Sequence, residues 1–244
     1  MEEIVYQKMS RIASDNWWFA SRRDLVRILL KRHLAGRKNC FILEAGCGPG
    51  NILTSLDDLG TIFGIDINEA AINMCKQKNA AYLSRATIMK IPFKDGSFDA
   101  VICSDVLYHV MVDDEAALKE MSRVCKKGGL LLIFEPAFEW LYSPHDIAEH
   151  ARQRYSKKEI CSKVKKSGLI IIKSSYHVFL LFPLILAVRL IKMIFLSGQS
   201  SDDLCTFPNL INKILLFIMA IENRILPFIN FPWGSTIFCL VVKT

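Results

Sequence analysis

The chain has 244 residues, of which 52% are hydrophobic, and its formal net charge is +7. This length and composition fit one large globular domain with an appendage. The eight cysteines form no C-x-x-C pair, so no metal site is expected. No apolar signal core follows the acidic start Met1-Glu2-Glu3, which predicts a location in a reducing cytoplasm.

Near the N-terminus, residues 15–23 place three aromatic side chains beside Arg22 and Arg23. A helix is predicted here, within an N-terminal helical cap that spans residues 1–38. Two roles are open for this helix. Either it lies across the mouth of a ligand pocket, where an arginine can pair with a carboxylate, or it only covers the sheet with Trp17, Trp18 and Leu25.

Residues 41–50 form a short apolar strand that ends in Glu44, followed at once by the glycine-rich turn G-C-G-P-G. Its three glycines lack a Cβ, so the backbone can bend sharply and approach a ligand closely. A helix that begins near Asn51 is expected to direct free N–H groups at the same point. The third glycine comes one residue earlier than in the G-x-G-x-x-G of dinucleotide-binding folds. A carboxylate at position 44 favours a positively charged ligand group over a pyrophosphate.

Residues 61–67 are predicted to form a second buried strand, which ends in Asp66. Asp66 lies about twenty residues after the glycines, where a carboxylate can bind the ribose hydroxyls of a nucleotide. The alternative is that Asp66 only caps the helix predicted from residue 68. The preceding glycine turn favours the ribose contact.

The central part of the chain continues the alternation of strands and helices. A surface turn within residues 91–98 leads into a buried strand over residues 99–103, and the chain leaves this strand through S-D-V-L-Y-H-V at residues 104–110. A helix is predicted over residues 113–125, because acidic side chains lie in its first turn and basic ones in its last. Residues 130–134 form the next apolar strand.

Five motifs resemble those of the class I S-adenosylmethionine-dependent methyltransferases in their order and spacing. They are E-A-G-C-G-P-G, G-I-D-I, I-P-F-K-D-G-S-F-D-A-V, L-Y-H-V and K-K-G-G-L-L-L-I-F-E-P. The small-molecule branch is the most similar, and the resemblance covers roughly residues 40–175 and the last strand. It implies an α/β, Rossmann-like fold with a seven-stranded, mostly parallel sheet, helices on both faces and an antiparallel last strand. The segment W-W-F-A-S-R-R is similar to the opening of bacterial members of this branch, several of them linked to cell-surface glycan or lipid pathways.

The resemblance also implies how the cofactor, S-adenosylmethionine, is bound. Glu44 and the glycine turn would bind its methionine part, Asp66 its ribose hydroxyls, and Ile67 would lie against the adenine. Thr87 stands where the family commonly has an acidic residue, so adenine contacts are left to Thr87 or the Ile88 backbone, and the affinity is expected to be modest. The predicted cofactor-binding residues are Arg22, Glu44, Gly46, Cys47, Gly48, Gly50, Asp66, Ile67, Thr87, Ile88 and Ser104.

A long, strongly apolar stretch separates the strand predicted at residues 169–174 from the last strand at 235–242. Residues 177–233 are therefore predicted to be a helical insertion into a domain made of residues 39–176 and 234–244. Each apolar run is broken by proline or charge, so a membrane-crossing helix is not favoured. Because the sixth strand should end on the cofactor side, two amphipathic helices here would form an apolar roof or lie in a membrane interface; a dimer contact and extra core packing are the alternatives.

Methyl transfer needs a base only when the acceptor is protonated at neutral pH, as a hydroxyl is. His109 and His145, which follow the fourth and fifth strands, are candidate bases, and Tyr108 is a candidate for orienting the acceptor. Each histidine is alternatively structural. The pair Arg154-Tyr155 resembles one seen in this branch and either lines the acceptor pocket or braces the loop.

The sequence thus predicts a methyltransferase that acts on a small acceptor, apolar or lipid-linked, with O-methylation favoured. The expected location is the cytoplasm, with peripheral contact on the inner face of the membrane through residues 177–233. Basic residues cluster within residues 1–40 and 152–166, but no nucleic-acid-binding module is recognisable, so nucleic acid is not expected as a partner. Two alternatives remain: a non-catalytic scaffold that binds a membrane or partner, and a nicotinamide-dependent oxidoreductase, which the early third glycine disfavours.

Overall fold

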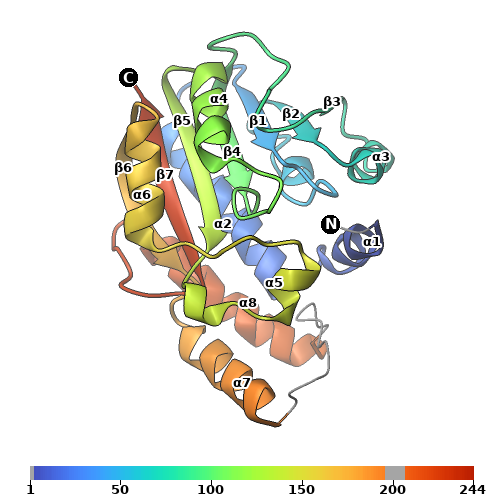
Figure 1. The fold of residues 1–244 in the computed structure, drawn as a ribbon. Helices are drawn as coiled ribbons and strands as arrows, with labels where there is room; N and C mark the ends of the chain where they lie inside the picture. Colours follow the sequence, from blue (N-terminus) through green and yellow to red (C-terminus); the bar gives the residue numbers. More distant parts are fainter. Residues whose placement is uncertain (1–2, 196–206) are drawn as a thin grey trace.

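The computed structural model describes residues 3–195 and 207–244, which build helices around one seven-stranded sheet (Figure 1). The strand order is β3-β2-β1-β4-β5-β7-β6. Strand β7 is antiparallel to both of its neighbours, and the other pairings are parallel. The predicted Rossmann-like, mostly parallel sheet is confirmed. The strands are β1 (Phe41–Ala45), β2 (Thr61–Asp66), β3 (Tyr82–Arg85), β4 (Phe98–Ser104), β5 (Cys125–Pro136), β6 (Leu169–His177) and β7 (Thr236–Lys243).

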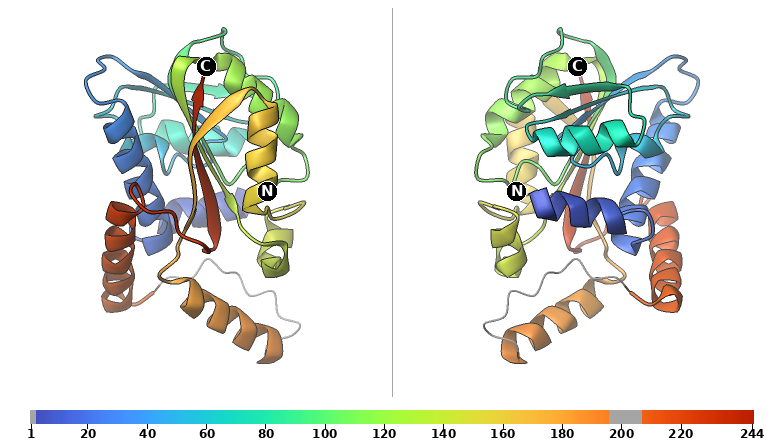
Figure 2. Two further views of the ribbon diagram at one scale, coloured as in Figure 1. Left: turned by 90° about the vertical axis from the view of Figure 1, so that its left-hand side faces the viewer. Right: turned by 90° about the vertical axis from the view of Figure 1, so that its right-hand side faces the viewer.

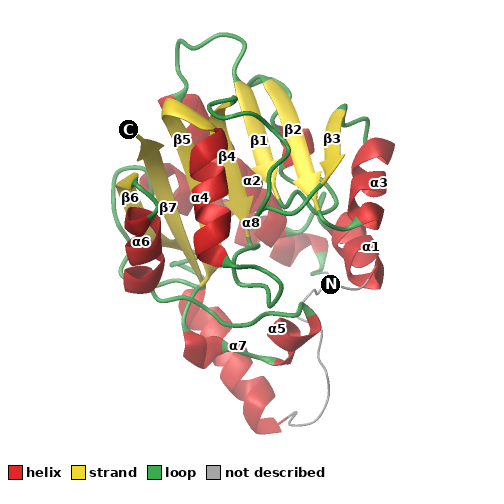
Figure 3. Ribbon diagram, turned by 45° about the horizontal axis from the view of Figure 1, so that its top comes forward, coloured by secondary structure: helices red, strands yellow, loops and turns green. Residues whose placement is uncertain are grey.

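Helices cover both faces of the sheet (Figures 2 and 3). On one face, α4 (Asp114–Val124) and α6 (Lys157–Lys166) bury their apolar sides in a core with β4 and β5. On the other face, α2 (Trp17–His33) and α3 (Glu69–Gln77) pack against β1 and β2. The remaining helical elements are α1 (Glu3–Ile12), α5 (Pro144–Ala148), α7 (Phe182–Phe195), α8 (Asn209–Ile225) and the 3-10 turns η1 (Leu53–Ser55) and η2 (Glu139–Leu141).

Side-chain caps fix the starts of α2, α4 and α6. Asn16 accepts a hydrogen bond from the Trp18 N–H at the start of α2. Asp113 accepts from two backbone N–H groups of α4, and Ser156 accepts from the Glu159 N–H at the start of α6. Each cap satisfies donors that have no partner inside the helix. The helix predicted over residues 113–125 is therefore confirmed.

The helix predicted from Asn51 is wrong, because this segment forms only the one-turn η1. The link from Gly50 to β2 is short, and it must bury Leu53 and Leu56 before it returns to the sheet. No length remains for a full helix. The turn therefore approaches a ligand with loop backbone rather than with the N-terminus of an α-helix.

Helices α7 and α8 lie between β6 and β7 in the chain. His177 at the end of β6 pairs with Thr236 at the start of β7, so both helices extend from the carboxyl edge of the parallel strands, where the strand order predicts them (Figure 2). Of the predicted insertion, residues 196–206 lie outside the described part, and the division of the chain into cap, core and insertion stays a prediction. No helix within the described residues is both long and apolar enough to cross a membrane.

Helix α8 packs along α2 and is tied to the sheet by a polar junction. Its side chains Leu215 and Met219 are buried next to Trp17. Asn223 donates hydrogen bonds to the Ser21 carbonyl (2.8 Å) and to Asp24, and its Oδ1 lies 3.0 Å from His177 Nε2. The junction joins α2, α8 and the end of β6.

Candidate active site

A cavity of about 710 Å³ opens at the carboxyl edge of the sheet. This edge is where open parallel sheets bind ligands, and the volume is in the range of cofactor and small-molecule sites. Its walls come from α1 and α2, the turn after β1, the ends of β2 and β4, the 104–112 and 146–154 segments, and helices α7 and α8. The chain thus brings together residues that are far apart in sequence.

The glycine turn after β1 forms one wall of this cavity. Gly46 has a φ of 81°, in the left-handed region that favours glycine. A Cβ at this position would overlap the Val106 side chain. The backbone N–H groups of Gly46 and Cys47 donate to the Ile65 carbonyl, at 2.8 and 2.9 Å. These contacts hold the turn against β2 with its backbone close to the cavity.

Glu44 lies on the cavity wall at the end of β1 and is almost fully buried. Its Oε2 has no hydrogen-bond partner within the described residues. Burial raises the pKa of Glu44 well above its ordinary value, and the nearby Cys75 adds to the increase. A buried carboxyl with an unpartnered oxygen is suited to a cationic ligand group, because only a partner of opposite charge compensates its desolvation.

Asp66, at the end of β2, faces the cavity beside the glycine turn. Its two carboxylate oxygens accept hydrogen bonds from the backbone N–H groups of Gly48 and Asn68, both at 2.8 Å. Burial raises the pKa of Asp66, and these two hydrogen bonds oppose the increase. Helix α3 is capped by Asn68 instead, whose side chain accepts from Ala70. The cap of α3 is therefore Asn68 and not Asp66, which had been the alternative role of Asp66.

The residues predicted to contact adenine line the cavity next to Asp66. Ile67 is exposed, and Thr87 and Ile88 lie on the same wall. The Thr87 hydroxyl oxygen accepts from the Met89 N–H at 3.3 Å, which fixes the local loop. No acidic side chain replaces the one that the family commonly has at position 87.

Arg22 reaches from α2 to the floor of the cavity, where it is 4% exposed. It donates to Ser104 Oγ (2.8 Å), Asp105 Oδ2 (3.1 Å) and Thr236 Oγ1 (3.1 Å). Its guanidinium carbon lies 4.6 Å from the centre of the Phe134 ring. The predicted helix therefore covers the sheet through Leu25 and also brings an arginine to the cavity. The pairing of this arginine with a ligand carboxylate stays a prediction.

Tyr108 and His109 also line the cavity, with their ring centres 4.3 Å apart. The Tyr108 hydroxyl donates to Glu149 Oε2 at 2.7 Å. Burial, reinforced by the Glu149 charge, raises the pKa of Tyr108 well above its ordinary value. Burial lowers the pKa of His109, so its imidazole is neutral and able to accept a proton near neutral pH.

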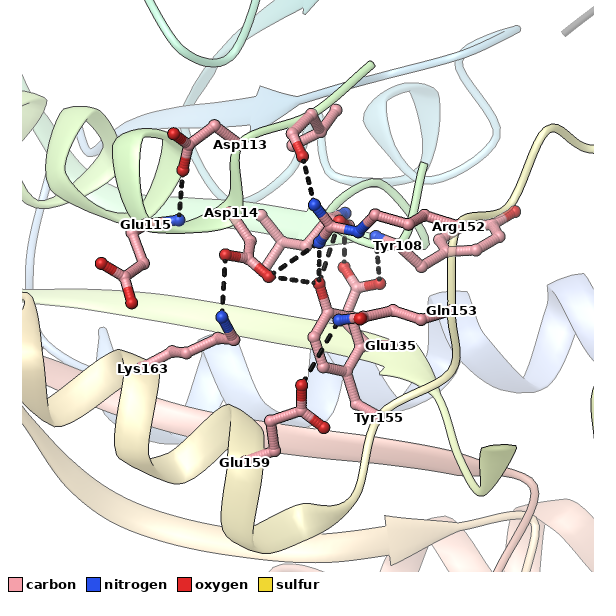
Figure 4. A network of polar contacts seen from close by, with 12 residues as sticks. Tyr108, Asp113, Asp114, Glu115, Glu135, Arg152, Gln153, Tyr155, Glu159 and Lys163 are labelled. Atoms are coloured by element: carbon pink, nitrogen blue, oxygen red, sulfur yellow. Dashed lines mark hydrogen bonds and ion pairs between the residues drawn. The ribbon is translucent and has the colours of Figure 1, made fainter. Parts of the chain in front are cut away.

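A polar network behind this wall fixes the loop that carries Tyr108 (Figure 4). Glu135 is fully buried and accepts from the backbone N–H groups of residues 106, 107 and 108. The Tyr155 hydroxyl donates to Asp114 (2.8 Å) and also lies 3.0 Å from the Leu107 carbonyl oxygen, and Asp114 also pairs with Arg152 and Lys163. Tyr155 thus braces the loop, which is one of the two roles predicted for it.

The segment after β5 is held by a buried ion pair. Arg154 makes a bidentate contact with Asp146, at 2.8 and 2.9 Å, and both residues line the cavity. Arg154 therefore braces this segment and lines the cavity, while its predicted place in an acceptor pocket stays a prediction. The side chain of the neighbouring His145 lies outside the described part, so its catalytic role stays a prediction.

Apolar side chains from α7 and α8 close the side of the cavity away from the sheet. Those from α7 are Leu184, Ile185 and Val188, and those from α8 are Ile211 and Leu215. This wall is largely apolar, and its role as a roof over a bound acceptor stays a prediction.

Asp105 and Glu149 are among the cavity residues that were not predicted from the sequence. Asp105 pairs with Arg22 at 3.1 Å, and its φ of 57° places it in the left-handed region. Glu149 meets Tyr108, 41 positions away. The S-D and E-H pairs that contain these acids gave no motif by which to single them out.

The geometry agrees with the comparisons with known proteins. Residues 43–133 match the family model described as a methyltransferase domain. These residues therefore form a methyltransferase domain, and the chain as a whole has the fold of solved S-adenosylmethionine-dependent methyltransferases. Over 121 residues it is 34% identical to the demethylmenaquinone methyltransferase of Staphylococcus aureus, a match that covers 44% of this chain and 50% of that protein. The chain spans about half the length, or less, of the curated relatives it matches.

Solved methyltransferase structures share the fold. A putative sarcosine dimethylglycine methyltransferase from Galdieria sulphuraria superposes with a TM-score of 0.61 at 18% identity, covering 91% of this chain and 86% of that one. The geranyl diphosphate C-methyltransferase of Streptomyces coelicolor, solved with its acceptor and S-adenosylhomocysteine, gives a TM-score of 0.59 at 14% identity, covering 89% and 77%. At these identities the likeness shows the common class I fold.

Proposed function

We propose that this methyltransferase transfers a methyl group from S-adenosylmethionine to a small, lipid-like acceptor, with a hydroxyl favoured as the group that is methylated. The observation that carries the proposal is a single cavity with two contrasting ends. One end has the glycine turn and the unpartnered carboxyl oxygen of Glu44, and the other is closed by the apolar side chains of α7 and α8. The first end suits the cofactor and the second an apolar acceptor.

Each predicted cofactor residue has a role at the first end. Glu44 would bind the ammonium of the methionine part, and Arg22 would bind its carboxylate. The backbone of Gly46, Cys47, Gly48 and Gly50 would surround this part closely. Asp66 would accept from the ribose hydroxyls, since each carboxylate oxygen can accept more than one hydrogen bond. The remaining contacts would come from Ile67, Thr87, Ile88 and Ser104.

The chemistry requires positioning, exclusion of water and one proton acceptor. When bound, S-adenosylmethionine supplies an electrophilic methyl group on a sulfonium centre. The acceptor hydroxyl would lie at His109, which takes its proton as the oxygen gains the methyl group. Tyr108 would hold the acceptor or the loop in place rather than act as a base, because its phenol stays protonated and donates to Glu149.

The relatives support an apolar acceptor. The Staphylococcus aureus relative is named for demethylmenaquinone, and the Streptomyces coelicolor structure holds geranyl diphosphate. Both molecules are lipid-like. In this chain the apolar part of such an acceptor would pack against the cavity wall formed by Leu184, Val188, Ile211 and Leu215.

The test is methyl transfer from tritium-labelled S-adenosylmethionine to hydroquinones with and without a prenyl chain, measured as label in the organic phase. We expect label in the prenylated probe above all. A His109→Gln variant should lose about 10²- to 10⁴-fold in kcat while cofactor affinity is retained. Cofactor binding without transfer to any probe would favour the non-catalytic scaffold. Binding of a nicotinamide cofactor instead would favour the oxidoreductase.

A further inference from the structure

Helix α8 presents an unbroken apolar stripe on the side that faces away from α2. Leu210, Ile214, Phe217 and Ile221 follow one another at intervals of four, three and four residues, which places them on one helix face. Leu210 is 71% exposed and Phe217 69%. The opposite face, with Leu215, Met219 and Asn223, is buried against α2 and the core. An isolated exposed leucine is ordinary, but a full helix stripe of large apolar side chains marks an interaction surface.

The segment that follows α8 also carries large exposed apolar side chains. Phe228 is 72% exposed, Ile229 is 54% exposed and Trp233 is 47% exposed. The docking face is defined here as Leu210, Ile214, Phe217, Ile221, Ile225, Phe228, Ile229 and Trp233. Its aromatic and branched side chains are those that enter the interfacial region of a bilayer.

The charges around the docking face are basic. Lys213 and Arg224 are exposed along one flank of the α8 stripe. Arg32 of α2 lies over the Phe228 ring, 4.5 Å from its centre. The sole acidic side chain in the sequence of α8, Glu222, is buried and accepts from the backbone N–H groups of Phe179 and Leu180. The Lys213 and Arg224 side chains on the flank of α8 therefore have no acidic neighbour on the surface of the same helix.

We propose that the docking face lies in the interface of an anionic membrane, with α8 parallel to the bilayer plane. The apolar stripe would enter the headgroup and acyl boundary, while Lys213, Arg224 and Arg32 bind anionic headgroups. A second copy of the chain fits this surface less well. A twofold contact places each surface against itself, which would bring the cations of both copies together without acidic partners from α8.

The position of α8 gives this docking a role that rests on the proposed function. Ile211 and Leu215 on the same helix line the active-site cavity, one quarter to one half turn away from the docking face. α8 therefore separates the membrane from the acceptor end of the cavity. An acceptor dissolved in the bilayer would need to pass only this helix and α7 to reach His109.

The test is co-sedimentation of the purified chain with vesicles of phosphatidylcholine, with and without phosphatidylglycerol, in the absence of any methyl acceptor. We expect binding that strengthens with phosphatidylglycerol and weakens with salt. Phe217→Glu should lose most of the binding, and Lys213→Gln with Arg224→Gln should weaken it about fivefold for each cation lost. Tyr82→Glu is the matched control, because it changes an exposed aromatic residue on β3, away from the face, and should bind as the wild type does.

Thermal melting and S-adenosylmethionine titration of each variant separate loss of docking from loss of folding or of the cofactor site. If the wild type does not sediment with anionic vesicles while it still binds the cofactor, the docking proposal fails and the proposed function stands. If sedimentation velocity instead shows a dimer that Phe217→Glu dissociates, the face is a subunit interface and the proposal is likewise overturned. Vesicle binding without cofactor binding would retain the docking face and reject the proposed function.

Discussion

Two buried carboxyl groups, Glu44 and Asp66, control the electrostatics of the cavity beside the glycine turn. Burial raises the pKa of both. Asp66 is compensated by backbone donors from Gly48 and Asn68, whereas Glu44 Oε2 has no partner in the described structure. Glu44 is therefore the group whose protonation a cationic ligand should change most.

At the residue scale we expect S-adenosylmethionine binding to release a proton from Glu44. The ligand ammonium favours the carboxylate, so affinity should rise with pH up to the raised pKa of Glu44 and level off above it. Calorimetric titration in two buffers with different ionisation enthalpies measures this proton release. Glu44→Gln should abolish it and weaken binding about 10- to 100-fold, the cost of losing a charged hydrogen bond. Glu149→Gln, a cavity carboxylate near Tyr108, should retain it, and equal release from all three proteins would contradict the assignment.

The sequence could predict those site residues whose positions are fixed by a local motif, but not those whose positions are fixed by tertiary contacts. Glu44, the glycines and Asp66 belong to short motifs at strand ends, where the backbone alone determines their place. Asp105 and Glu149 meet their partners only through tertiary folding, because Arg22 and Tyr108 are distant in sequence. Such pairs leave no local pattern, so they were missed.

At the element scale, the turn after β1 depends on Gly46 for two separable reasons. Its φ of 81° is strained for any other residue, and a Cβ there would overlap Val106. Gly128 has a φ of 70°, but no atom lies near the position that a Cβ would take. Substitution of Gly128 therefore measures the cost of the backbone conformation without that of an overlap. We expect Gly128→Ala to lower the free energy of unfolding by about 1–2 kcal/mol and Gly46→Ala by about 2–5 kcal/mol. Urea unfolding measures both, and equal losses would show that the overlap is relieved without cost.

The junction of β6 and α8 should make folding depend on pH. Burial lowers the pKa of His177 to about 3, well under the ordinary value of about 6.5. The unfolded chain therefore binds more protons between these values, and stability falls as pH decreases through this window. The His177 contribution alone should lower the free energy of unfolding by about 2 kcal/mol between pH 7 and pH 5. The measurement is urea unfolding of the wild type and of His177→Gln at both pH values. Between pH 7 and pH 5 the free energy of unfolding should fall by about 2 kcal/mol more in the wild type than in the variant. Equal pH dependences of the two proteins would refute the assignment.

The elements that the sequence predicted well are those with a local signal. The central strands are continuous apolar runs, and α4 has acidic side chains in its first turn and a basic one in its last. Strand β3 was not predicted, because it is a short, partly exposed edge strand with little apolar pattern. The helix after Gly50 was predicted wrongly, because the motif does not reveal that the link back to β2 is too short.

At the scale of the whole molecule, the order of strands places every functional segment at one edge of the sheet. The cofactor turn, the Tyr108 loop and the helices between β6 and β7 all leave from carboxyl ends of parallel strands. The sequence predicted this convergence from the succession of motifs. It could not predict how α8 divides its surface between α2, the cavity and the docking face, since that division depends on packing between distant segments.

We expect this protein to bind S-adenosylmethionine through the turn after β1 and the acid at the end of β2. The most direct test is calorimetric titration of the wild type and of Asp66→Ala with S-adenosylmethionine and S-adenosylhomocysteine. We predict micromolar binding of both ligands by the wild type and at least a tenfold loss in a folded Asp66→Ala variant. A folded wild type that binds neither ligand would contradict the account.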